Sequence, residues 1–148
     1  YLNFICDIYR VPVKTRKAKV DSLIEQFQME KSINSLISSF SHGMKQKTAL
    51  IAAFAHDPKI LILDEPFIGL DPESFIILKN QMNRLRSMGG AILFSSHILD
   101  VVERVCNKIA VIKDGKLVYE GATEEATRLN NLESFFMELN HADAISSL

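Results

Sequence analysis

Ile60-Leu61-Ile62-Leu63-Asp64-Glu65-Pro66 is the stretch of sequence that decides the fold. An apolar run that is bounded by acids and a proline is typical of a β-strand buried on both faces. A second such run covers residues 91–95. Between the two, Asp71-Pro72-Glu73 predicts a helix start, because a capping Asp, an early Pro and an acid in the first turn all favour one. Strand, helix and strand in this order favour a parallel sheet with a crossover helix.

The residues on either side extend this prediction to an α/β protein with a helical part in front. Apolar residues recur at helical spacing over 20–27, and the nearly all-apolar stretch 43–56 predicts a buried helix with Ser41 as its N-cap. Further along, a helix over 98–105 precedes a β-hairpin that turns at Asp114-Gly115. Two more helices are expected after Thr123.

Composition excludes several classes of protein. The chain has 148 residues, 47% of them hydrophobic, and 17 basic against 18 acidic side chains, which gives a formal net charge of -1. It is too apolar for a disordered chain and too neutral to bind nucleic acid by electrostatics alone. No run reaches the roughly 18 apolar residues of a membrane span, and no signal-peptide pattern is expected. Cys6 and Cys106 make no disulfide framework, so we expect a reducing compartment.

Asp64 and Glu65 are candidate functional residues because they end a strand, and ligands of open α/β sheets bind at the carboxyl ends of strands. One carboxylate could hold Mg²⁺ through its waters while the other orients and deprotonates an attacking water. His97 follows the second strand and could hydrogen-bond a phosphate oxygen. Taken singly, such acids are more often a solvated turn, and such a histidine is more often a residue at a helix start.

Two helix starts are further candidates. Ser41-His42-Gly43-Met44 opens the buried helix, where backbone N–H groups and the helix dipole attract anions and Gly permits close approach. Gly69-Leu70-Asp71-Pro72 opens the crossover helix. Taken alone, the first segment is more often an ordinary N-cap, and the second is explained by a turn and a capped helix, which does not exclude a functional role.

In order and spacing, these segments resemble the motifs of ATP-binding cassette (ABC) ATPases. Residues 40–47 resemble the signature motif, residues 60–66 the Walker B strand, residues 69–72 the D-loop, and residues 95–97 the switch-histidine loop. The resemblance covers nearly the whole chain. It implies an α/β fold: a partial P-loop NTPase (RecA-like) parallel-sheet core with an all-helical subdomain, a β-hairpin and C-terminal helices. Residues 1–58 would be the rest of the helical subdomain, 59–122 half of the ATPase core, and 123–148 the C-terminal helices and tail.

The resemblance also implies roles for individual residues in the core. Asp64 would help to bind Mg²⁺, and Glu65 would be the general base for the water that attacks the γ-phosphate of ATP. His97 would contact that phosphate. Asp71 would lie at the interface with a second ATPase subunit, since family members hold ATP between two subunits arranged head to tail.

In the signature motif, Ser41 and Gly43 would bind the γ-phosphate of the ATP held mainly by the second subunit. The chain departs from the usual motif at His42, which replaces a Gly, and at Met44, which replaces a Gln. His42 either adds a contact to the phosphates or points to solvent. The run from Met44 to Lys47 resembles bacterial export-type ABC ATPases of the drug- or peptide-efflux kind.

The sequence contains no Gly-x-x-x-x-Gly-Lys-[Ser/Thr] phosphate loop. By the resemblance, that loop would lie upstream of Tyr1, so the chain is predicted to be the C-terminal portion of a longer subunit and inactive alone. The family's phosphate-loop strand lies between the strands that match residues 91–95 and 109–112. We therefore expect the isolated chain to rearrange its strands or to pair with another copy, because each unsatisfied buried backbone group costs about 1–3 kcal/mol.

The main functional prediction is the ATP-hydrolysing subunit of an ABC transporter. It would bind ATP and Mg²⁺, work with a transmembrane permease, and lie in the cytoplasm on the inner face of the cell membrane. One alternative is a soluble ABC ATPase acting on ribosomes or DNA, which the near-neutral charge does not favour; no nucleic-acid partner is expected. The other is a non-catalytic interaction module, against which the Asp64, Glu65 and His97 set argues.

Overall fold

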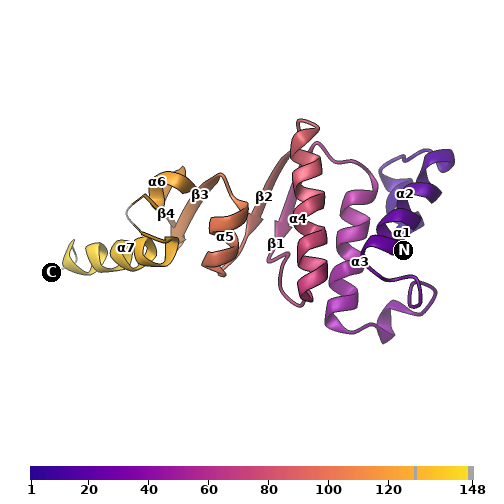
Figure 1. Ribbon diagram of the computed structural model, residues 1–148, viewed down its shortest axis with the longest axis horizontal. Helices are drawn as coiled ribbons and strands as arrows, with labels where there is room; N and C mark the ends of the chain where they lie inside the picture. Colours follow the sequence, from indigo (N-terminus) through magenta and orange to yellow (C-terminus); the bar gives the residue numbers. More distant parts are fainter. Residues whose placement is uncertain (129, 147–148) are drawn as a thin grey trace. The chain divides into compact units, whose positions relative to one another are not determined.

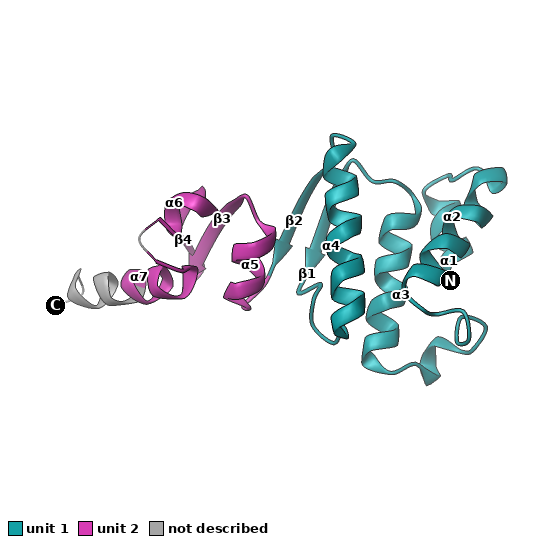
Figure 2. Cartoon of the chain, in the orientation of Figure 1, with its two compact units in different colours: residues 1–95 teal, residues 96–148 magenta. Residues whose placement is uncertain are grey.

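The computed structural model describes residues 1–128 and 130–146 (Figure 1). The chain forms two compact units, residues 1–95 and residues 96–148 (Figure 2). The first unit contains the helical part and a parallel sheet, and the second contains a β-hairpin with helices. The division into residues 1–58, 59–122 and 123–148 is based on the functions of the motifs and not on compactness. It stays a prediction.

The helical part of the first unit packs around a buried helix, as the sequence predicted. Its helices are α1 (Leu2–Ile8), α2 (Val13–Gln26), the short 3-10 helix η1 (Ile37–Ser39) and α3 (His42–Ala55). The hydroxyl of Ser41 caps α3 by accepting a hydrogen bond from the N–H of Met44 at 3.3 Å. On α3, Leu50 and Ile51 are at most 2% exposed. Burial of the apolar face therefore stabilises this helix.

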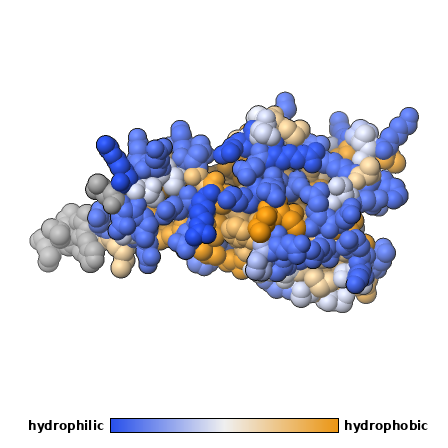
Figure 3. Space-filling model, viewed as in Figure 1, coloured by the Kyte–Doolittle hydropathy of each residue, from blue (hydrophilic) through white to orange (hydrophobic). Residues whose placement is uncertain are grey.

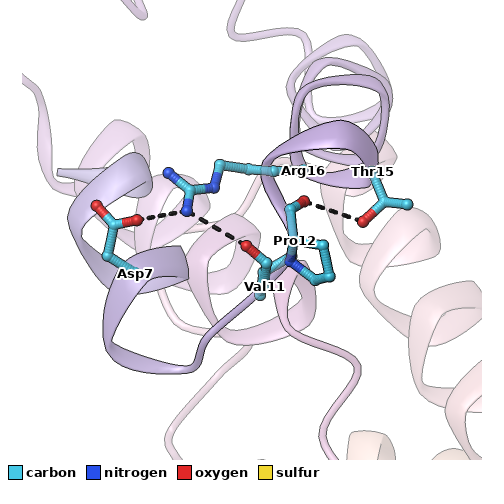
Figure 4. A network of polar contacts seen from close by, with 5 residues as sticks. All are labelled: Asp7, Val11, Pro12, Thr15 and Arg16. Atoms are coloured by element: carbon cyan, nitrogen blue, oxygen red, sulfur yellow. Dashed lines mark hydrogen bonds and ion pairs between the residues drawn. The ribbon is translucent and has the colours of Figure 1, made fainter.

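A polar network joins α1 to the start of α2 (Figure 4). The guanidinium of Arg16 donates hydrogen bonds to the carboxylate of Asp7 and, at 3.3 Å, to the carbonyl of Val11. The hydroxyl of Thr15 donates to the carbonyl of Pro12 at 3.1 Å. The Arg16 side chain is only 13% exposed, so this network fixes the connection between α1 and α2.

The sheet of the first unit is parallel and is crossed by a helix, as predicted. Strands β1 (Ile60–Asp64) and β2 (Ala91–Ser95) pair in register, and α4 (Pro72–Ser87) connects them (Figure 1). Residues along one side of α4 are buried: Ser74, Leu78, Gln81, Met82 and Leu85. The crossover helix therefore covers one face of the sheet, and the in-register pairing places the two strand ends side by side.

The prediction that both strands are buried on both faces is wrong. Along β1, Leu61 is buried at 6% exposure, while Ile60 and Ile62 are 70% and 72% exposed. On β2, Leu93 is 64% exposed, and the register places it beside Ile62. Figure 3 shows apolar surface over the region of these strands. A continuous apolar run indicates a strand suited to two covering layers, but the described part of the chain supplies only one of them.

The second unit is built on the predicted hairpin. Its elements are α5 (Leu99–Val105), β3 (Lys108–Lys113), β4 (Lys116–Ala122), α6 (Thr123–Ala126) and α7 (Leu132–Ser146). Asp114 and Gly115 have φ angles of 49° and 72°, and a two-residue hairpin turn of type I′ requires such positive values at both positions. Ile109, Ala126 and Leu132 form a small core that ties α6 and α7 to the hairpin.

The strands of the described residues form two separate two-stranded sheets, β1–β2 and β3–β4. Rearrangement of strands to close the expected gap, one of the two predicted outcomes, is therefore wrong for this chain. The reason is that β3 already satisfies one edge through its local hairpin partner, which the Asp114-Gly115 turn fixes in register. Pairing with another copy stays a prediction. Within residues 1–128 and 130–146, no helix is both long and apolar enough to cross a bilayer.

Candidate functional site

Two neighbouring acids lie at the carboxyl end of β1 and are fastened to the end of β2. The parallel register places Asp64 opposite Ser95. The hydroxyl of Ser95 donates a hydrogen bond to Oδ1 of Asp64 and accepts one from the backbone N–H of Glu65 at 3.2 Å. One serine thus contacts both candidate residues, through the carboxylate of Asp64 and through the backbone of Glu65. Motif reasoning gave Ser95 no such role, although pairing residues 60–64 with 91–95 in register points to it.

Glu65 has an unusual backbone conformation. Its φ angle is 43°, in the left-handed region that costs a non-glycine residue about 1–2 kcal/mol. Pro66 follows it and is fully buried, so the chain turns sharply as soon as the strand ends. Strained residues of this kind gather at functional sites, where the surrounding structure holds them in place. Other non-glycine residues share such a positive φ: Arg10, Gln28, Asp57 and Asp114. The conformation therefore marks the sharp turn and does not by itself distinguish a functional residue from an acidic turn.

Asp64 and Glu65 suit a metal ion that keeps most of its waters, and not a metal ion held by protein side chains alone. In the part of the chain that the structure describes, no three His, Cys, Asp or Glu side chains are grouped so that they could hold a metal. Mg²⁺, however, keeps several of its waters and is usually held by one or two carboxylates together with substrate phosphates. Asp64 is exposed, and only its Oδ1 has a hydrogen-bond partner among the described residues. Its second oxygen fits that type of Mg²⁺ ligand.

The start of α3 packs closely against the loop that follows the acids. A Cβ atom at Gly43 would lie 2.6 Å from the carbonyl oxygen of Gly69, which is a clash with backbone. A Cβ atom at Gly69, whose φ is 77°, would lie 2.6 Å from Cδ2 of the His42 ring. His42 therefore has a contact of its own in this chain: its ring lies against Gly69. Glycine at both positions permits this close approach.

Asp71 and α3 are joined by charge. The carboxylate of Asp71 caps α4 by accepting hydrogen bonds from the N–H of Ser74 at 2.9 Å and from its hydroxyl at 3.0 Å. It also pairs with the ammonium of Lys47 at 2.6 Å. The hydrogen bond from Lys47, followed by that from Ser74, holds the pKa of Asp71 well below its usual range. Asp71 is therefore ionised at every pH near neutrality.

Residues 3–68 match the family model described as "ABC transporter". The chain is 38% identical over 139 residues to the ABC transporter ATP-binding protein NatA of Bacillus subtilis (strain 168), which covers 92% of this chain and 56% of NatA. A solved structure of the ATP-binding subunit of an ABC transporter superposes with a TM-score of 0.89 at 30% identity, covering 94% of this chain. The chain belongs to the ABC transporter ATP-binding family.

The family prediction and the partial P-loop NTPase fold are thus confirmed. The chain spans 60% of that solved subunit, so the ABC relatives it matches are considerably longer. It is also 34% identical over 113 residues to the Nod factor export ATP-binding protein I of Rhizobium meliloti, covering 76% of this chain and 34% of that protein.

The first unit brings most of the predicted ABC site residues into one body. Asp64 and Glu65 of the Walker B segment, the signature residues Ser41 to Met44 and Asp71 of the D-loop all belong to it. His97 belongs to the second unit, two residues beyond Ser95. The phosphate contacts of the signature residues, Asp71 and His97 stay predictions.

The two cysteines take no part in the site. Cys6 is buried in the first unit, and both cysteines are free thiols. Burial raises the pKa of Cys106 to about 11, so this thiol is protonated and a poor nucleophile at neutral pH.

Proposed function

We propose that this chain is the Walker B half of an ATP-hydrolysing subunit that drives substrate transport through an ABC transporter. The observation that carries the proposal is the end of the parallel sheet, where Ser95 holds the carboxylate of Asp64 and the backbone of Glu65. Ligands of open α/β sheets bind at that end, and two acids there can divide metal binding from base catalysis.

Each residue has a distinct task in this mechanism. Asp64 holds Mg²⁺, which when bound neutralises charge on the phosphates. Glu65 accepts the proton of the attacking water, and its backbone N–H bond to Ser95 fixes where its side chain starts. His97 hydrogen-bonds the terminal phosphate. The start of α3, capped by Ser41 and opened by Gly43, faces the γ-phosphate of the ATP on a second subunit, because a helix N-terminus attracts anions.

The proposed partners follow from this arrangement. A second ATPase subunit joins head to tail, and a transmembrane permease moves the cargo. The subunit then lies in the cytoplasm, at the inner face of the cell membrane. Similarity to a Nod factor export protein supports an export-type transporter, in line with the Met44 to Lys47 run.

ATP turnover tests the proposal directly. The full-length subunit should hydrolyse Mg–ATP, whereas the 148-residue chain should show no turnover, because the sequence contains no phosphate loop. Release of inorganic phosphate is measured for both after size-exclusion purification, with chelation of Mg²⁺ as the control. If the isolated chain hydrolysed ATP at the rate of the full-length subunit, the expectation that turnover needs the phosphate loop would be contradicted. An inactive full-length subunit would contradict the ATPase proposal itself.

Self-association of the isolated chain is expected through the uncovered face of the β1–β2 sheet. Ile60, Ile62 and Leu93 present adjacent apolar side chains there, each at least 64% exposed. Replacing Ile62 and Leu93 with Lys should shift the chain to monomer in analytical ultracentrifugation. Ile76→Lys on α4, where Ile76 is 58% exposed, is the matched control and should leave association unchanged. A wild-type chain that stays monomeric at high micromolar concentration would show that this expectation is wrong.

A further inference from the structure

Contacts at three places tie the signature helix α3 to the loop over residues 66–71. The side-chain amide of Gln46 donates a hydrogen bond to the carbonyl of Pro66 at 3.1 Å. The ammonium of Lys47 pairs with Asp71 at 2.6 Å. Between them, Gly43 approaches the carbonyl of Gly69 so closely that no Cβ would fit. The loop is therefore held to one helix at its start, its middle and its end.

The ion pair differs from an ordinary surface pair. The side chain of Lys47 is only 14% exposed, whereas that of Asp71 is 49% exposed. A cation that is largely withdrawn from water needs its partner, because leaving it unpaired is costly. In contrast, Lys17 and Asp21 on α2 form an ion pair of the same length, 2.6 Å, with side chains that are 86% and 55% exposed. That exposed pair contributes little.

The same carboxylate serves two elements. Asp71 caps α4 through Ser74 and pairs with α3 through Lys47. The loop that it ends begins at Pro66, directly after the candidate base Glu65. Gln46 therefore links α3 to the residue after Glu65, and Lys47 links α3 to the start of α4.

We propose that Lys47 is a positioning residue for ATP hydrolysis. Through Asp71 it locks the D-loop to the signature helix, so that a phosphate bound at the N-terminus of α3 sets the position of the loop that follows Glu65. The inference rests on the proposed function and extends it, because it assigns to Lys47 the coupling between two motifs of the same subunit. Lys47 acts through Asp71 and need not touch ATP.

The test compares two lysine substitutions in the full-length subunit. Lys47→Met removes the coupling charge and keeps a similar side-chain length, and Lys17→Met removes the charge of the exposed pair. We expect Lys47→Met to lower kcat about tenfold or more, equivalent to about 1.4 kcal/mol, with the Kd for ATP unchanged. Lys47→Arg should restore most of kcat, because it keeps the charge. Lys17→Met should match the wild type.

A second variant separates positioning from helix capping. Asp71→Ser keeps a good N-cap for α4 and loses the partner of Lys47. If the pair acts as one unit, the double variant Lys47→Met/Asp71→Ser has the kcat of the single variants, whereas independent roles would multiply their losses. Activity is normalised to the folded fraction measured by circular dichroism, so a loss of folding alone leaves kcat unchanged.

The possible outcomes separate a failure of the Lys47 inference from a failure of the proposed ATPase function. Suppose that hydrolysis requires Glu65 but that Lys47→Met has as little effect on kcat as Lys17→Met. That result would overturn the inference about Lys47 and leave the proposed function standing. Multiplied losses in the double variant would also overturn it. Absence of hydrolysis by the wild-type full-length subunit would overturn the proposed function together with the inference.

Discussion

Replacing Glu65 with Gln in the full-length subunit is expected to lower ATP turnover by about 10²–10⁴-fold, while ATP still binds. Gln has the shape of Glu but cannot accept the proton of the attacking water. The substitution leaves the backbone N–H of residue 65 in place, so its bond to Ser95 and the orientation of Asp64 are retained. Phosphate release at saturating Mg–ATP measures turnover, and equilibrium binding of a fluorescent ATP analogue measures the Kd.

Glu73→Gln is the matched control for this experiment. Glu73 is an exposed acid in the first turn of α4, eight positions further along, and makes no contact on which the proposed mechanism depends. It should keep turnover within about twofold of wild type, since surface substitutions away from special features have small effects. Turnover by Glu65→Gln equal to that of Glu73→Gln would show that Glu65 is not the base. Loss of ATP binding in Glu65→Gln would instead indicate that it acts in binding.

Replacing Leu78 with Ala is expected to destabilise the first unit by about 2–5 kcal/mol. Leu78 lies at the centre of α4 and is fully buried at 0% exposure, so truncation removes apolar contacts and leaves a cavity. Whole domains are stable by only about 5–15 kcal/mol, which makes this a large fraction of the total. Urea unfolding of the 148-residue chain, followed by far-UV circular dichroism, measures the shift in midpoint.

Ile76→Ala on the same helix separates burial from helix propensity. Ile76 is 58% exposed, and Ala is the better helix former, so this variant should lie within about 0.5 kcal/mol of wild type. Equal losses for the two variants would mean that α4 does not pack as described. Because the candidate site lies at the end of the sheet that α4 covers, the destabilised variant should also lose turnover in the full-length subunit as its folded fraction falls.

Much of the fold could be predicted because its signals are local. Ser41 and Asp71 cap the helices that begin beside them, and Asp114-Gly115 fixes the hairpin. A cap or a tight turn is decided by residues within a few positions of one another, so their types reveal it. The order of strand and helix in the first unit, and the ABC motifs in the candidate site, could be identified in the same way.

The hydrogen bond between Ser95 and Asp64 and the ion pair between Lys47 and Asp71 were not predicted. Ser95 reaches Asp64 across 31 positions, and Lys47 reaches Asp71 across 24 positions of chain. Such contacts exist only once strand register and helix packing are set, and many registers suit the same residue types. The left-handed conformation of Glu65 likewise follows from how the surrounding chain holds the turn, not from a preference of Glu.

The sequence by itself determined the order of strand, helix and strand in the first unit, the caps at Ser41 and Asp71, and the hairpin turn at Asp114-Gly115, because side chains close together along the chain decide these features. Its motifs also determined to which family the chain belongs. Only the tertiary structure decided which partners the acids have and which strand faces are covered. Ile60 and Ile62 are as apolar as Leu61, yet they are exposed while Leu61 is buried. Burial is a property of the layer that packs on a residue, and here α4 supplies that layer on one side of the sheet only.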